Sequence, residues 1–150
     1  MVFKRALLGT LAIAALSVSA CDKGPPPHNL NELGRAAAAR YSSGTVIAFG
    51  TGSDCIAQPA MTLRFLDHGK GTYTAPSKTC PNPDGGVAAL CDLGLEATLG
   101  TSPGTGTLKI LKVPDTTWGD YTGEVNLVFD TAGGEETYVF EFVAPVCGIE

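Results

Sequence analysis

Short runs of alternating apolar and polar residues follow one another from Gly44 onward, separated by glycine, proline, asparagine and aspartate. The pattern is clearest between Glu124 and Asp130, where Val125, Leu127 and Phe129 alternate with polar residues. A period of two is typical of β-strands that bury one face. The same pattern predicts strands over residues 45–50, 61–66, 72–75, 87–90, 93–99, 107–113, 124–130 and 136–144.

Breaks in this pattern predict how the strands connect. Residues 67–71 and 131–134 have the chemistry of hairpin turns. The alternation fails between Ile110 and Leu111, which predicts a β-bulge there. Segment 136–144 is apolar on one face and partly apolar on the other, so we expect it to lie centrally in its sheet. Seven to eight short strands predict a mainly β domain, either an antiparallel β-sandwich or a barrel, with one short N-terminal helix.

The predicted helix spans residues 29–41. Asn29 or Asn31 can cap it, and four consecutive alanines, residues 36–39, favour its propagation. Its narrow apolar stripe is typical of a helix that covers one end of a sheet, and a partner-binding helix is the alternative. The stripe consists of Leu30, Leu33, Ala37 and Tyr41.

The first twenty residues form a secretory leader. Lys4 and Arg5 precede an apolar run too short to span a bilayer comfortably, and small residues lead to a cysteine. The tetrapeptide Val-Ser-Ala-Cys, residues 18–21, resembles the lipobox of bacterial lipoproteins. The resemblance implies cleavage before Cys21, a diacylglyceryl group on its thiol, and acylation of the new amino group, with palmitate as an expected fatty acid. Ordinary secretory cleavage after Ala20 is the alternative.

Three segments follow from this interpretation. Residues 1–20 are the signal peptide, residues 21–28 are the lipidated cysteine and a proline-rich tether, and residues 29–150 are one β-rich domain. The location implied is the bacterial cell envelope. Asp22 resembles the signal that keeps some lipoproteins at the periplasmic face of the inner membrane, and the outer membrane stays open because Lys23 weakens the match.

The net charge of the mature part limits the classes of binding partner that we expect. The leader holds two of the ten Lys and Arg residues and none of the fifteen Asp and Glu residues, so the mature part carries about −7. An acidic domain is poorly suited to nucleic acid or to adsorption on anionic lipid. We therefore expect no nucleic-acid partner, and membrane contact through the lipid on Cys21.

Four cysteines remain after Cys21. Cys55, Cys80, Cys91 and Cys147 form an even set in an exported chain, which predicts two disulfides and leaves three connectivities open. A proline- and glycine-rich stretch between Cys80 and Cys91 could bring these two together, and Cys55 would then bond Cys147. Zinc spacing is absent, so the sequence predicts neither a metal site nor a cofactor.

Catalytic signatures are weak. Ser53 lies in a glycine-rich loop without the spacing of a nucleophile elbow, and His68 lies in a predicted turn. A small hydrolase-type envelope enzyme built from such scattered residues is therefore the alternative to a non-catalytic domain. We predict no catalytic residues.

Trp118 and Tyr121 are the strongest functional signal in the mature domain. If exposed, two aromatics in a glycine-containing loop would suit recognition of an envelope protein or glycan, and if buried they would plug one end of the fold. The sequence thus favours a membrane-anchored binding or assembly domain. A structural subunit of a larger envelope complex is a further alternative.

Overall fold

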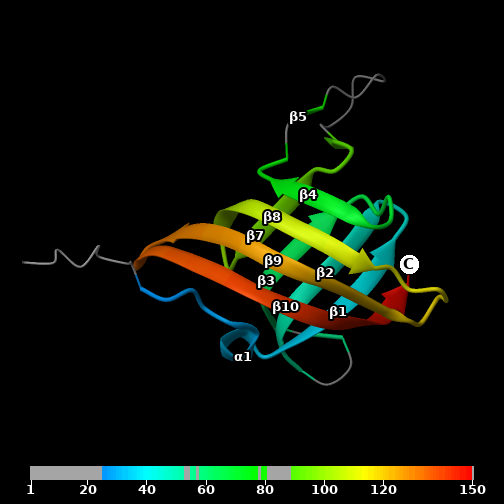
Figure 1. The fold of residues 1–150 in the computed structure, drawn as a ribbon, viewed down its shortest axis with the longest axis horizontal. Coiled ribbons are helices and arrows are strands. Elements are labelled where there is room, and N and C mark those ends of the chain that lie inside the picture. The colour runs from blue at the N-terminus through cyan, green and yellow to red at the C-terminus, as the bar shows by residue number, and fades with distance from the viewer. Residues whose placement is uncertain (1–24, 53–54, 57, 78, 81–88, 150) are drawn as a thin grey trace, which may run out of the picture.

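The computed structural model describes residues 25–52, 55–56, 58–77, 79–80 and 89–149 (Figure 1). It is mainly β, with one short helix, as the alternation predicted. The elements are α1 Leu30–Leu33, β1 Arg35–Tyr41, β2 Gly44–Thr51, β3 Gln58–Phe65, β4 Gly71–Ala75, β5 Thr79–Cys80, β6 Ala89–Leu90, β7 Leu95–Leu99, β8 Ser102–Lys112, β9 Asp120–Thr131 and β10 Gly134–Ile149.

Seven strands close into a barrel. Hydrogen-bonded neighbours run β8, β7, β3, β2, β1, β10 and β9, and β9 pairs again with β8. Every pairing in this ring is antiparallel except that of β1 with β10. Strand β4 pairs with β8 outside the ring, and β5 and β6 form a separate two-stranded sheet. Of the two architectures that the sequence left open, the structure therefore shows the barrel.

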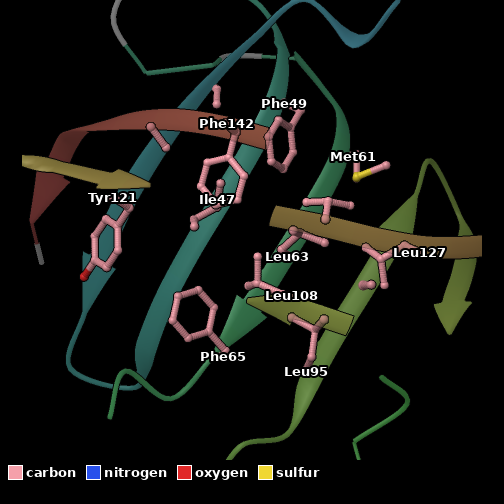
Figure 2. Close-up of a cluster of buried hydrophobic side chains, with 14 of the residues drawn as sticks. Ile47, Phe49, Met61, Leu63, Phe65, Leu95, Leu108, Tyr121, Leu127 and Phe142 are labelled. Atoms are coloured by element: carbon pink, nitrogen blue, oxygen red, sulfur yellow. The ribbon is translucent and has the colours of Figure 1, made fainter. Parts of the chain in front are cut away.

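Side chains that alternate inward fill the barrel (Figure 2). On β9, Val125, Leu127 and Phe129 are at most 1% exposed, which confirms the face predicted for them. Phe49, Leu63 and other apolar side chains from β2, β3, β7 and β8 meet them in one continuous core. Burial of this apolar surface is the main term that favours folding.

The long strands β9 and β10 form a regular hairpin. Thr131 pairs with Gly134 across the predicted turn, and β10 lies between β9 and β1 in a closed ring where every strand has two neighbours, so no strand of the ring is central. The predicted bulge is also present, because the register of β8 against β9 shifts between Ile110 and Lys112. The second face of β10 is nevertheless open to solvent, since Val139 is 47% exposed.

The helix prediction is wrong beyond residue 33. Helix α1 has only four residues and ends at Gly34, whose φ of 104° suits glycine and whose N–H bonds the Leu30 carbonyl. A side chain at position 34 would overlap the backbone of Gly50 on β2. The chain then extends, and the four alanines form the middle of β1.

Tertiary pairing explains why the alanines form a strand. Ala38 lies opposite Ile47 of β2 and Val146 of β10, and it is fully buried. Helix propensity favours alanine by less than about 1 kcal/mol per residue. Two rows of backbone hydrogen bonds and the burial of small side chains outweigh that preference.

The turn at residues 67–71 does not make a hairpin between its flanking strands, contrary to the prediction. Strand β3 pairs with β2 and β7, whereas β4 pairs with β8. The Tyr73 hydroxyl orders the turn instead, since it donates to the Gly69 carbonyl at 3.0 Å and accepts the His68 N–H at 3.0 Å. The turn therefore crosses one end of the barrel.

Candidate functional site

The barrel end at the start of β9 separates the two aromatics singled out in the sequence. Trp118 lies in the segment between β8 and β9 and is 65% exposed, the most of the large apolar side chains in the described part of the chain. Tyr121 is fully buried. They diverge because Tyr121 is the second residue of β9 and follows its inward alternation, whereas Trp118 precedes the strand. Exposure and burial thus apply to different members of the pair.

Backbone contacts hold the segment that carries Trp118. The Gly119 N–H donates to the Thr116 carbonyl at 3.4 Å, and the Gly119 carbonyl accepts the Val146 N–H of β10 at 3.0 Å. Gly119 also packs closely on Pro114, where an added Cβ would lie 2.9 Å from the proline Cβ. The Trp118 side chain therefore projects from a segment whose backbone is held by Thr116 and by Val146 of β10.

Tyr121 anchors a buried polar network beneath this end. Its hydroxyl donates to the Asp67 carboxylate and lies 3.4 Å from the Thr45 hydroxyl. Asp67 also accepts the Gly69 N–H at 2.9 Å. Burial, followed by the hydrogen bond to Asp67, raises the pKa of Tyr121 to about 12. The hydroxyl of Tyr121 therefore stays protonated at physiological pH, and its hydrogen bond to Asp67 connects the 67–71 turn to the barrel.

His68, the candidate base of the sequence, pairs with a carboxylate in the structure. Its imidazole is about half exposed, and Nε2 lies 3.0 Å from an Asp92 carboxylate oxygen. Ser53, its proposed partner, lies outside the described residues, so the pairing of these two stays untested. The contact with Asp92 joins the 67–71 turn to the segment before β7.

One of the predicted disulfides is present. Cys55 bonds Cys147 across a sequence separation of 92 residues, with the two Cα atoms 5.3 Å apart. It ties the segment after β2 to the last residues of β10, and it belongs to one of the three connectivities that the sequence left open. Cys91 is also disulfide-bonded. The side chain of Cys80 and the whole of Cys21 lie outside the described residues, so the Cys80–Cys91 bridge and lipidation stay predictions.

Two surface depressions were not signalled by the sequence. A hollow of about 290 Å³ lies against the 67–71 turn, with Arg40, Thr45, Asp67 and His68 among its lining residues. A larger, shallow one of about 770 Å³ lies where α1 and β1 begin, against the outer faces of β8, β9 and β10. It collects residues distant in sequence, such as Leu30, Leu111 and Val143, so no local pattern could have revealed it.

Within residues 25–149, gaps excepted, no three His, Cys, Asp or Glu side chains gather as ligands for a metal ion. No described helix has the length and apolar character needed to cross a bilayer.

Comparisons with protein-family models, curated proteins and solved structures find no match to this chain.

Proposed function

We propose that this chain is an envelope lipoprotein, held to a membrane through lipid on Cys21, whose barrel is a non-catalytic binding or assembly module. The observation that carries the binding role is the exposure of Trp118. A large aromatic side chain that is 65% exposed on a backbone-fastened segment contributes little to the core. Such side chains are enriched among the residues that dominate binding energy at interfaces.

The neighbouring structure supports this assignment. The buried ring of Tyr121 and its hydrogen bond to the half-buried Asp67 tie the 67–71 turn to this end of the barrel without any contribution from Trp118. An exposed anchor on a rigid support loses little conformational entropy on binding. The expected partner is an envelope protein or glycan, and Asp22 favours the periplasmic face of the inner membrane for the anchored protein.

Trp118→Ala is expected to change the free energy of unfolding by less than about 0.5 kcal/mol, because the ring leaves no cavity in the core. A core tryptophan would cost about 3–5 kcal/mol on the same change. Denaturant unfolding measures this difference. Trp118 is the sole tryptophan of the chain, so its emission reports its surroundings directly, and we expect that emission to be quenched readily by iodide.

Binding is the second half of this test. In intact envelopes, crosslinking of the protein to its envelope partner is expected to weaken for Trp118→Ala. It should persist for Val139→Ala, which removes an exposed apolar side chain elsewhere on the barrel. Early unfolding of Trp118→Ala, or equal crosslinking of both variants, would contradict the binding role of Trp118.

Cys21→Ala is expected to abolish fatty-acid labelling and to release the protein from the membrane fraction, because the thiol is the acceptor of the diacylglyceryl group. Metabolic labelling with a fatty acid and fractionation measure both effects. Formation of the Cys55–Cys147 disulfide serves as the control for export, since this bond needs an oxidising compartment. Undiminished labelling of an exported Cys21→Ala protein would refute lipidation at Cys21.

A further inference from the structure

The N-terminal part of the described chain is fastened to β10 at His28. The His28 N–H donates to the Thr137 carbonyl at 2.7 Å, and the His28 carbonyl accepts the Val139 N–H at 3.2 Å. The imidazole stacks on the Tyr138 ring, with centroids 4.9 Å apart and planes at 27°. We call these contacts the His28 clasp.

Helix α1 reinforces the clasp from the other side. The His28 Nδ1 contacts the Glu32 carboxylate, and the second carboxylate oxygen accepts the Asn29 N–H at 3.2 Å. Tyr138 is itself only 6% exposed, and its hydroxyl donates to Glu136 at 3.0 Å. The clasp therefore joins three elements: the end of the tether, the cap of α1 and strand β10.

The direction of the chain decides where the tether leaves the barrel. His28 pairs with Tyr138 in the parallel sense, so the residues before it run back toward Gly134 and the hairpin turn. Figure 1 shows the described chain beginning beside the turn between β9 and β10. The four residue steps from Cys21 to Pro25 span at most about 14 Å. A lipid on Cys21 must therefore lie close to the hairpin.

Trp118 lies just before the start of β9, at the end of that strand opposite the hairpin. It precedes Asp120, the first residue of β9, whereas the hairpin follows Thr131. Eleven strand steps cover about 36 Å. The anchoring end and the exposed aromatic end are thus separated by the full length of β9.

We propose that the His28 clasp makes the hairpin end of the barrel its membrane-facing end, so that the Trp118 loop faces away from the bilayer toward a partner. This rests on the lipidation of Cys21 proposed above. The clasp acts by shortening the free tether: without it, the chain between lipid and barrel would lengthen, and either end could approach the membrane.

The competing arrangement lays the barrel on its side. Its best surface is the outer face of β10, where Val139 and Val143 are 47% and 58% exposed. Glu141 lies between these valines and opposite Glu124 of β9. Pressing this face into headgroups would desolvate both carboxylates. Lys109 Nζ lies 3.6 Å from the Glu124 carboxylate, but no ion pair among the described residues offsets the cost at Glu141. The acidic mature domain also gains no attraction from anionic lipid.

Tryptophan quenching distinguishes the two arrangements. The lipidated mature protein, which begins at Cys21, is placed on phosphatidylcholine vesicles that carry a headgroup-attached nitroxide quencher. Its sole tryptophan, Trp118, should be quenched weakly. In the matched variant Trp118→Phe/Gly133→Trp, the new tryptophan at the exposed hairpin tip should be quenched severalfold more strongly. An added Cβ at Gly133 has only one ordinary contact, 3.7 Å from the Thr131 hydroxyl, so the tip can accept it.

Two further variants test the clasp itself. His28→Ala removes the side-chain part of the clasp, namely the ring stack and the Glu32 contact, and keeps its two backbone hydrogen bonds. Insertion of about ten Gly and Ser residues after Lys23 lengthens the tether directly. Both should bring the quenching at positions 118 and 133 closer together. Equal quenching at the two positions in the lipidated wild-type background, or stronger quenching of Trp118, would overturn the orientation alone. Protein whose mass shows no acyl group on Cys21 would overturn the anchoring and the orientation together.

Discussion

Replacing both members of the Cys55–Cys147 pair by serine is expected to lower the free energy of unfolding by about 4 kcal/mol. The bond closes a loop across 92 residues of sequence separation, and removing it gives the unfolded chain many more conformations. In the folded protein the same bond fastens the end of β10, where Gly148 pairs with Ala39 of β1 in the only parallel register of the barrel ring. Denaturant unfolding of the oxidised wild type and the double variant measures the loss.

The predicted Cys80–Cys91 pair supplies the matched control. Cys80→Ser/Cys91→Ser opens a much shorter loop and should cost less, because the entropic effect grows with the logarithm of loop length. Alkylation of the unreduced, denatured wild type should add no mass, since both pairs are predicted to be oxidised. Equal stability of wild type and Cys55→Ser/Cys147→Ser would show that the bond does not constrain the unfolded chain as argued.

Gly106→Ala is expected to destabilise the barrel by about 4 kcal/mol, because two costs add at this position. The φ of Gly106 is +131°, which side chains rarely adopt, and an added Cβ would overlap the Asn126 carbonyl and lie 3.1 Å from the Leu127 Cα. Both neighbours are backbone atoms of β9, so they cannot rotate away. Gly106 also pairs with β4 on its other side, which prevents β8 from shifting.

Gly134→Ala separates the two costs. Gly134 has a similar φ of +114° but no atom within 4 Å of an added Cβ, so only the backbone strain of about 1–3 kcal/mol should remain. Thermal and denaturant unfolding of both variants give the comparison. If both alanine variants lose the same stability, the close approach of β8 and β9 at Gly106 contributes nothing.

Burial of Tyr121 could have been read from the sequence, whereas exposure of Trp118 could not. Continuing the inward set of Val125, Leu127 and Phe129 backward by twos reaches position 121, so the alternation already indicated an inward side chain. No such pattern governs the loop before the strand. Whether Trp118 packs or projects depends on how that loop folds against Pro114 and Val146, which are distant from one another in the sequence.

The residues of the Tyr121 hydrogen-bond network are also distant from one another in the sequence. Thr45, Asp67 and Tyr121 come from three separate segments, and only closure of the barrel brings their oxygen atoms together. The contact of His68 with Asp92 arises for the same reason, because it follows from the path of the turn across the barrel end.

The sequence by itself determined the β class, the inward faces of β9 and β10, their hairpin and the bulge in β8, because periodicity and turn chemistry act over a few neighbouring residues. Tertiary structure decided the rest. The alanines after Gly34 had a local preference for helix, and pairing with β2 and β10 overrode it. Closure into a barrel, the partner of β4 and the exposure of Trp118 depend on contacts between distant segments, whose free energies appear only once the whole ring of strands has formed.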